Sequence, residues 1–458
     1  MEQTKKLSKL TLLAYGCGDF ASSLCWTFIG SYLSVYYTDV VGLAPATASA
    51  IMLIARIWDG VNDPMFGAIA ERTNTKRGRF RPYIFFGAPI LAVLSVLAFT
   101  TFGHGTTAVI WAAVSYIACG MMYTVVNLSY GSLSTVMTTD PDDINQLNSW
   151  RMMGTNLGSV LLNAITPPLL LHFSGGTQPY TPHSYTIMAV IFAICAIPLF
   201  YFVYANCKET VKPVAQGKKI PIAQSIKSVI TNGPLMLIFV IQLLAMTAFF
   251  GRMGVVIYYL MYNVQRFDLI SAFMSLPSLF TVIGILLTKN FTVRIGKKKM
   301  ATVGYIGAGA TLIAVYLVGW TNIPVLLALH CIYGFFCFSF PIPMAMVPDA
   351  INYEEDRHGV RADGTSYATV SLSTKFGSAF GVAIALNIMG ATGYVANAQQ
   401  TEAALGGINL TVNLIFGIVY LLCLIPLYFY PLNEKRSSEI LARLEQKRMS
   451  TAPQEVTE

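Results

Sequence analysis

Charged residues are scarce in this chain of 458 residues. Asp, Glu, Lys and Arg together make up 11% of it, whereas a soluble globular domain has roughly 25%. Hydrophobic residues make up 55%. So few charges cannot cover the surface of a soluble protein of this size, and the composition therefore indicates an integral membrane protein.

Several signatures of chemistry are also missing. The eight Cys are scattered without CxxC spacing, and the five His have no partner at metal-ligand spacing, so we expect neither a disulfide framework nor a resident metal. The sequence has no nucleophile elbow, no phosphate-binding loop and no solvent-exposed basic module. These absences argue against an enzyme, an enzyme cofactor and nucleic-acid binding.

Apolar stretches of about 20 residues, the length that an α-helix needs to cross a bilayer, are abundant. Some exceed this length, which predicts tilted or broken helices, and the Gly and Pro of "YGCGD" and "FPIPMAMVP" would permit both. We expect the first stretch to remain as a span rather than to be cleaved, because it contains Asp19. Twelve spans are predicted, near residues 12–38, 46–70, 83–102, 106–138, 152–171, 184–206, 233–262, 269–288, 300–320, 322–348, 364–393 and 408–431.

The basic residues indicate how these spans are oriented. With the loops numbered alternately from the N-terminus, one set of loops and the two terminal segments hold 26 of the 30 Lys and Arg residues, and the opposite set holds only Arg266. Short cytoplasmic loops carry the excess of Lys and Arg. The pattern predicts that both termini are cytoplasmic and that the net charge of +8 reflects topology.

A polar, Pro-containing segment divides the chain into six spans plus six. We predict an N-terminal half over 1–206, a central cytoplasmic linker over 207–231, a C-terminal half over 232–431 and a cytoplasmic tail over 432–458. An internal echo supports this division, since "GAIAERTNTKRGR" after the second span resembles "GILLTKNFTVRIGKKK" after the eighth. Two six-helix repeats around a site at the midplane are typical of transporters. The expected fold is an all-α membrane protein of twelve helices.

The second span carries three ionisable groups in "RIWDGVNDP". A charge at the bilayer centre costs at least ~2.5 to 3.5 kcal/mol, so such residues usually face the protein interior and mark an ion or substrate path. Asp59 and Asp63 are four residues apart and share one helical face with Asn62. Two carboxylates roughly 6 Å apart repel each other by about 3 kcal/mol at an effective dielectric constant of 20, which favours a bound cation or proton. If the ion is Na⁺, the oxygens of Asp59, Asn62 and Asp63 are suitable ligands.

A second interpretation of this stretch is structural. Arg56 lies three residues before Asp59, so the trio could be a static ion-pair network that joins helices. Counting Asp19, Asp59 and Asp63 against Arg56 and Lys375 leaves one surplus negative charge, which a bound Na⁺ or H⁺ would neutralise.

Longer motifs resemble a known transporter family. They include "YGCGDF", "YYTDVVGL", "RIWDGVNDPMFGAIAERTNTKRGRFRPY", "YTVVNLSYGSLSTVMT", "SWRMMG" and "RADGTSYATVSLSTKFGSAFG". On these motifs the chain resembles, over nearly its whole length, the glycoside-pentoside-hexuronide:cation symporters of the major facilitator superfamily, the group that includes the melibiose permease. The resemblance implies a monomeric sugar:cation symporter in the cytoplasmic (inner) membrane of a bacterium.

The resemblance also implies roles for individual residues. Four positions match the family's cation site: Asp59, Asn62, Asp63 and Thr124. Lys375 matches a lysine near both cation and sugar, Asp19 and Arg151 match sugar-binding positions, and Trp26 stands where the melibiose permease has Tyr.

Sugar chemistry points to an overlapping set of residues. Hydroxyls are bound by charged and amide groups, and aromatic faces provide flat apolar surfaces, although most of the 56 aromatic residues must serve packing. The candidates for substrate binding are Asp19, Trp26, Asn127, Arg151, Phe340 and Lys375, with Tyr123 as a further aromatic. If the substrate were a glucuronide, Arg151 and Lys375 would be the natural carboxylate partners. Arg56, Asp349 and Arg252 complete the set as a charge network that could couple the two fluxes.

Departures from the family pattern narrow the substrate. Asn127 stands where the melibiose permease has a sugar-binding Asp, and Gly131 where it has Trp. Asn352 replaces a carboxylate found in many members, although Asp349 and Glu355 remain nearby. "SWRMMG" and "GRMGVVIYYLMY" resemble the pentoside, xyloside and glucuronide branches more closely, so melibiose itself is not expected.

Two other functions are compatible with a membrane protein of this kind. A sensor that binds a glycoside without transporting it would need a sizeable cytoplasmic effector domain, and the 27 residues of the predicted tail are too few for one. A carrier of lysophospholipids would need an apolar path open to lipid, which the density of polar midplane residues disfavours. Symport by alternating access, coupled to Na⁺ or H⁺, is the function that we predict.

Overall fold

The computed structural model describes residues 6–73, 75–138, 140–176, 180–210 and 222–451. These residues are almost entirely helical, and apart from a bridge between Thr75 and Gly78 the described segments contain no β structure. The first group of elements is α1 (Lys9–Val35), η1 (Tyr36–Val40), α2 (Pro45–Arg72), α3 (Arg81–Ala98), α4 (Thr106–Met137), α5 (Pro141–Phe173) and α6 (Pro182–Asn206). The second is α7 (Ile222–Thr231), α8 (Gly233–Tyr258), η2 (Tyr259–Val264), η3 (Phe267–Leu269), α9 (Ile270–Ile295), α10 (Lys297–Val318), α11 (Ile323–Phe336), η4 (Cys337–Ser339), α12 (Ile342–His358), α13 (Asp363–Ala391), α14 (Glu402–Asn409), η5 (Leu410–Ile415), α15 (Phe416–Leu422), α16 (Leu424–Phe429) and α17 (Glu434–Thr451).

Each of the twelve predicted spans coincides with one of these helices or with a run of consecutive ones, and some extend a few residues past the helix end, as 83–102 does beyond Ala98. In the described part of the chain, nine helical segments are long and apolar enough to cross a membrane by length and composition. The other three are α1, α2 and α5, which carry Asp19, the charges of "RIWDGVNDP" and Arg151. These three spans carry most of the charged candidates, whereas Lys375 and Thr124 lie on α13 and α4, which are among the nine.

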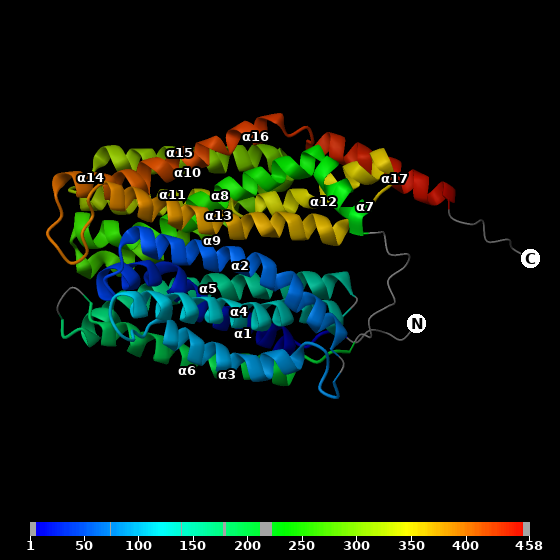
Figure 1. The fold of residues 1–458 in the computed structure, drawn as a ribbon. Coiled ribbons are helices and arrows are strands. Elements are labelled where there is room, and N and C mark those ends of the chain that lie inside the picture. Colours follow the sequence, from blue (N-terminus) through cyan, green and yellow to red (C-terminus); the bar gives the residue numbers. More distant parts are fainter. Residues whose placement is uncertain (1–5, 74, 139, 177–179, 211–221, 452–458) are drawn as a thin grey trace, which may run out of the picture.

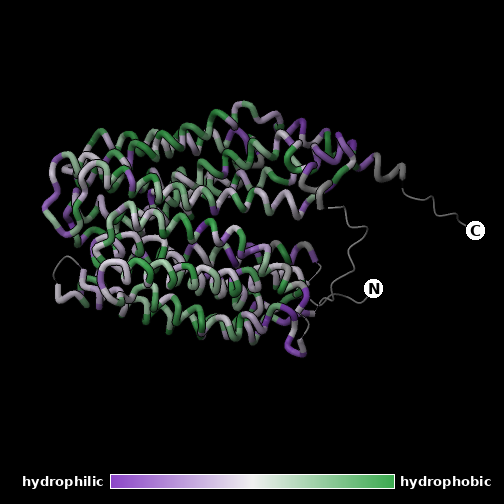
Figure 2. Tube along the Cα trace, viewed as in Figure 1, coloured by the Kyte–Doolittle hydropathy of each residue, from purple (hydrophilic) through white to green (hydrophobic). Residues whose placement is uncertain are grey.

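The helices form two bundles whose long axes run in roughly the same direction (Figure 1). α1 to α6 lie together in one bundle and α8 to α16 in the other, and α2, α5 and α1 of the first bundle pack against α13, α9 and α8 of the second. Both ends of the described chain and α17 lie at the same end of the molecule. Hydrophobic residues cover most of the length of the helices, and hydrophilic residues concentrate at the two ends (Figure 2).

Glycines set the spacing of the helices around α1. A Cβ on Gly154 of α5 would lie 2.1 Å from the backbone oxygen of Gly16, and one on Gly18 would lie 2.3 Å from the ring of Tyr130 on α4. Because no side chain fits at these points, the backbone of α1 approaches both neighbours closely. The glycines of "YGCGD" thus serve close packing, and α1 runs through them without a break.

The predicted break at "FPIPMAMVP" is confirmed. The 3₁₀ turn Cys337–Ser339 and Pro341 separate α11 from α12 within one span. Of the predicted linker, residues 211–221 lie outside the described part, and Ile222–Thr231 form α7. Most of the predicted tail forms α17, a charged helix that a search for apolar stretches does not detect. The boundaries of the two halves stay a prediction.

Candidate functional site

α2 and α13 meet at an ion pair in the middle of the molecule. The Lys375 ammonium on α13 lies within hydrogen-bond distance of the Asp63 carboxylate on α2 and 3.5 Å from the backbone oxygen of Asp59. The Thr124 hydroxyl on α4 donates to the same Asp63 carboxylate at 2.9 Å. The structure thus joins three residues that the sequence predicted to act together, one from each of three helices.

Asp59 lies one turn before Asp63, with only 6% of its surface exposed. Its carboxylate accepts a hydrogen bond from Arg56 at 3.3 Å, and the Arg56 guanidinium also lies 4.5 Å above the ring of Trp26. Trp26 in turn stacks on Tyr123, with ring centres 4.0 Å apart. Arg56 is therefore held between a carboxylate and an aromatic stack, in contact with α1 and α4.

Asn62 does not join this network. It is buried, its side-chain nitrogen finds no hydrogen-bond partner, and among the described residues no hydrogen bond links it to Asp59, Asp63 or Thr124. The ammonium of Lys375 occupies the space beside Asp63 that the predicted cation would take. A cation that bound Asp63 would have to displace Lys375.

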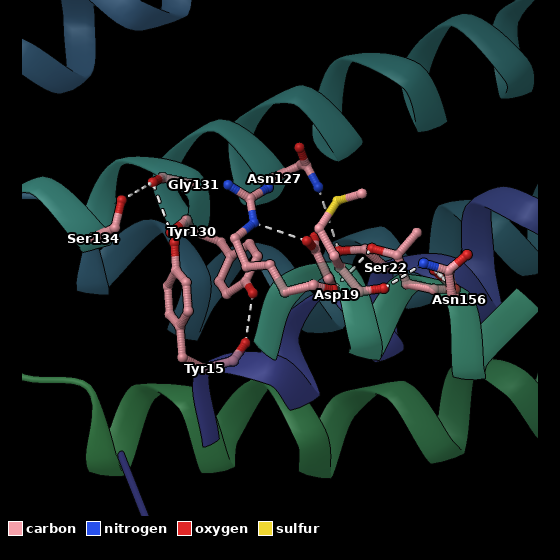
Figure 3. A network of polar contacts seen from close by, with 12 residues as sticks. Tyr15, Asp19, Ser22, Asn127, Tyr130, Gly131, Ser134 and Asn156 are labelled. Atoms are coloured by element: carbon pink, nitrogen blue, oxygen red, sulfur yellow. Dashed lines mark hydrogen bonds and ion pairs between the residues drawn. The ribbon is translucent and has the colours of Figure 1, made fainter. Parts of the chain in front are cut away.

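A second ion pair lies between α1 and α5. The Arg151 Nε donates to Asp19 at 2.8 Å, and its guanidinium lies 5.1 Å from the ring of Tyr130. The Asn127 amide donates to Ser22 at 3.5 Å, and Figure 3 shows Asn127 and Asp19 facing each other across α4 and α1. Asp19, Asn127 and Arg151, predicted to bind substrate, are therefore close together.

Gly131 leaves the room that Arg151 occupies. A Cβ at Gly131 would already lie 3.5 Å from Nη1 of Arg151, so a Trp at this position would displace the guanidinium. The chain thus has Gly131 where the melibiose permease has Trp, and this Gly leaves space for the guanidinium that pairs with Asp19.

The structure changes the charge count made from the sequence. That count omitted Arg151, which was placed in a loop, and Arg252. Arg151 belongs to α5 and pairs with Asp19, Arg56 pairs with Asp59 and Lys375 pairs with Asp63. The surplus of one negative charge is therefore not found in this group, because each of its three acids has a basic partner; the buried Arg252 and Asp39 lie outside these pairs.

A cavity of about 30 Å³ lies between the two bundles. This is room for about two water molecules, so a sugar fits here only when the bundles move apart. Arg56 is the one charged residue of its wall, and Ser378 lies one turn after Lys375 on α13. The wall consists of Ile29, Gly30, Met52, Arg56, Tyr116, Phe250, Ser378, Ala379 and Val382.

The remaining predicted residues lie elsewhere. Phe340 packs against Phe249 inside the second bundle, with ring centres 5.1 Å apart. Asp349 of α12 pairs with Lys297 of α10 at 2.7 Å. Arg252 of α8 lies 4.5 Å above the ring of Tyr333 and is not part of either ion-pair group. Of the predicted charge network, only Arg56 reaches the site between the bundles.

One group of contacts was missed by the sequence analysis. At the end of the molecule away from both termini, the buried Asp39 carboxylate of η1 accepts hydrogen bonds from the phenols of Tyr262 and Tyr394, which belong to the second bundle. Asn397 donates to the backbone oxygen of Asp39, and Thr38 bonds Tyr258 at 2.8 Å. We call this group the Asp39 latch. The only signal in the sequence was an acidic residue at the end of a span, in "YYTDVVGL".

Comparisons with known proteins agree on one kind of molecule. The family described as MFS/sugar transport protein matches residues 14–434. The chain is 32% identical to the isoprimeverose transporter of Lactiplantibacillus pentosus over 95% of this chain and 91% of that protein. It is 28% identical to the glucuronide carrier protein homolog of Escherichia coli K12 over 97% of each. Among solved structures, the nucleoside transporter NupG superposes with a TM-score of 0.65 at 14% identity, covering 92% of this chain and 99% of that one, which shows a shared fold.

Proposed function

The chain belongs to the MFS/sugar transport protein family, and from this premise we propose that it is a sugar:cation symporter that works by alternating access. Its relatives include a transporter of isoprimeverose and a glucuronide carrier homolog, so the proposed substrate is a sugar or glycoside. The proposed coupling ion is Na⁺ or H⁺. The proposed location is the cytoplasmic membrane of a bacterium, with both termini in the cytoplasm, as the distribution of Lys and Arg predicts, and with the monomer as the working unit.

The observation that carries this proposal is the contact of Asp63, Thr124 and Lys375. An ammonium ion and a coupling cation compete for the same carboxylate. When Na⁺ or H⁺ binds Asp63, Lys375 loses its partner, and its three N–H donors become free for the hydroxyl groups of a sugar. Cation binding then creates a part of the sugar site, which makes the two binding events mutually favourable.

The same competition limits which forms of the carrier can change conformation. Removal of one partner from a fully buried ion pair costs about 3 to 5 kcal/mol, because an unpaired charge remains in a medium of low polarity. The cost is smaller for Lys375 and Asp63, whose side chains are 26% exposed, but its sign is the same. The empty carrier keeps the Lys375–Asp63 pair, and the fully loaded carrier replaces it with cation–Asp63 and Lys375–sugar contacts. A carrier loaded with the cation alone has an unpaired Lys375, and this cost disfavours uncoupled movement of the cation.

The two bundles supply the moving parts. The Asp39 latch holds them together at the end away from the termini, while Asp63 and Lys375 keep about a quarter of their side-chain surface exposed. In alternating access the latch opens and the contacts at the opposite end close around the same site.

Uptake into proteoliposomes tests the proposal. A panel of xylosides, glucuronides and galactosides is offered under an imposed gradient of Na⁺ or of H⁺, with the native protein, with Asp63→Cys and with Asp268→Asn as the matched control in an exposed loop. We expect one gradient to drive accumulation by the native protein and the control, and no gradient to drive it in Asp63→Cys. Accumulation that ignores both gradients, or full coupling in Asp63→Cys, contradicts the proposal.

A further inference from the structure

Arg77 lies exposed in the loop between α2 and α3, at the end of the molecule that holds both termini. Its guanidinium lies 5.6 Å from the centre of the Phe85 ring. In the described part of the chain its backbone makes hydrogen bonds, whereas its side chain makes neither a hydrogen bond nor an ion pair. Arg81 also lies over a ring, that of Tyr204, but donates to the backbone oxygen of Tyr204 at 2.6 Å. Arg77 therefore offers its N–H donors at the surface.

Aromatic rings join α3 to α6 beneath Arg77. Phe85 of α3 stacks on Tyr201 of α6 with ring centres 5.1 Å apart, and it lies 4.9 Å from the ring of Tyr204. Phe86 meets Phe85 edge to face at 5.0 Å. A ring beneath a guanidinium attracts its charge, and aromatic residues favour the boundary between the apolar and polar parts of a bilayer. The surface thus presents a cation at the edge of an aromatic patch.

A stripe of exposed apolar side chains continues from this patch along α3. Phe86, Ile90 and Val93 are four and three residues apart, so they share one helical face, and 58%, 47% and 59% of their surfaces are exposed. α3 packs mainly against α4 and α6 and lies on the side of the first bundle that faces away from the second (Figure 1). In a chain that spans a membrane, such a face lies against the acyl chains of lipids.

The loop that holds Arg77 is strongly basic. Residues 72–81 include five basic side chains and no acid. Glu209, beyond the end of α6, is bound to this loop, since its carboxylate accepts hydrogen bonds from the backbone N–H groups of Arg79 at 2.7 Å, Phe80 at 2.8 Å and Arg81 at 3.1 Å. One carboxylate does not balance five positive charges, so the loop attracts anions.

The second bundle repeats this loop without the same surface. Gly78 and Gly296 lie shortly before α3 and α10, and their φ angles are 108° and 104°. Counted from these glycines, Ile295 and Val303 stand where the first bundle has the guanidinium and the ring beneath it. The end of α10 is also basic, so it provides a matched control within the same molecule.

We propose that this surface of the first bundle binds the headgroup of an anionic phospholipid of the phosphatidylglycerol type. The phosphate accepts hydrogen bonds from the Arg77 guanidinium, and an acyl chain lies over Phe85 and Phe86 and follows the stripe toward Val93. Basic sites between helices at the cytoplasmic side of a membrane suit anionic headgroups. A zwitterionic lipid carries its own ammonium group, which the basic loop repels, so the charge of the loop selects an anionic lipid. The inference requires neither the sugar nor the coupling ion.

Lipid titration of the purified protein tests this inference. Short-chain phosphatidylglycerol or phosphatidylcholine with the same acyl chains is added to the protein in detergent, and bound lipids are counted by native mass spectrometry. The native protein is compared with Arg77→Gln, with Arg77→Lys and with Lys299→Gln, which changes an exposed basic residue at the corresponding end of α10. The midpoint of thermal unfolding without added lipid shows that each variant is folded.

We expect the native protein to bind phosphatidylglycerol about fivefold more tightly than phosphatidylcholine. Arg77→Gln should lose about fivefold in affinity for phosphatidylglycerol, because a Lys or Arg near anionic headgroups contributes about 1 kcal/mol. Arg77→Lys keeps the charge and should retain a part of the preference, and Lys299→Gln should bind as the native protein does.

Four results overturn the inference. They are equal affinities for the two lipids, an unchanged affinity in Arg77→Gln, and an equal loss in Arg77→Gln and Lys299→Gln, which indicates diffuse attraction to any basic end. The fourth is displacement of the lipid by inorganic phosphate at constant ionic strength, which assigns the site to a free anion. None of these measurements uses a sugar or a cation gradient, so their outcome is separate from that of the uptake assay.

Discussion

Opening of the Asp39 latch is the step whose energy can be estimated best from this structure. Two phenols, those of Tyr262 and Tyr394, donate to the one carboxylate of Asp39, and each bond joins the two bundles. Hydrogen bonds to a charged group contribute about 1.5 to 3 kcal/mol each. In Asp39→Asn the amide oxygen can accept from one phenol, but the amide nitrogen is a donor and cannot replace the other bond.

The substitution therefore removes about 1.5 to 3 kcal/mol from the closed state at this end. Since 1.4 kcal/mol corresponds to a factor of ten, the ratio of open to closed molecules rises about 10- to 150-fold. The effect is confined to the latch, because Asp39 contacts none of the residues of the Asp63 ion pair.

Chemical labelling measures this shift. Ser378 lines the cavity between the bundles, so in a background without the native cysteines Ser378→Cys reports access to that cavity from outside the cell. A membrane-impermeant maleimide is applied to intact cells, with and without Asp39→Asn. We expect the labelling rate to rise at least tenfold in the latch variant.

Asp268→Asn serves as the control. Asp268 is an exposed acid in η3, and the salt bridge that the described residues give it is the one with Arg266. Its labelling rate should equal that of the parent. A rate that is unchanged or lower in Asp39→Asn shows that these bonds do not hold the cavity closed.

Two further substitutions test the site and the packing. Thr124→Val removes the hydroxyl that donates to Asp63, so we expect the cation concentration for half-maximal uptake to rise about tenfold. Thr166→Val on α5 is the control, because the Thr166 hydroxyl donates to the backbone of its own helix. An unchanged cation dependence in Thr124→Val counts against Thr124 as part of the cation site. Gly154→Ala places a Cβ against the backbone of α1, so we expect a loss of about 1 to 3 kcal/mol in stability, seen as a lower midpoint of thermal unfolding in detergent. Gly67→Ala is the control, because its Cβ meets open space. Equal midpoints for the two variants contradict the close packing of α1 and α5.

The sequence predicted those features of the fold that depend on residues close together in the chain. Hydropathy located twelve spans that coincide with helices, although α1, α2 and α5 are less apolar than the other nine, and the Pro residues of "FPIPMAMVP" marked the break between α11 and α12. It misplaced Arg151, because α5 begins at Pro141 behind the capping residue Asp140, eleven residues before its apolar part. It missed α17 because a charged helix has no apolar run.

The site was predictable only in part, because its contacts join residues far apart in the chain. Asp59 and Asp63 could be placed on one face of one helix, and the family resemblance added Thr124 and Lys375. The pairing of Asp19 with Arg151 across 132 positions and of Asp39 with Tyr394 across 355 depends on how each helix is rotated in its bundle. Charge counting failed for the same reason, since it needs to know which charges face the interior.

The central claim is that a cation and a sugar cross the membrane together because both use the region of Asp63 and Lys375. Cation flux driven by sugar tests it most directly. Proteoliposomes that hold equal Na⁺ and equal pH on both sides receive a transported sugar outside, and cation entry is recorded together with uptake of labelled sugar. The account predicts that Na⁺ or H⁺ enters in a fixed ratio to the sugar and that Asp63→Cys abolishes this entry. Sugar uptake by the native protein without movement of either cation contradicts it.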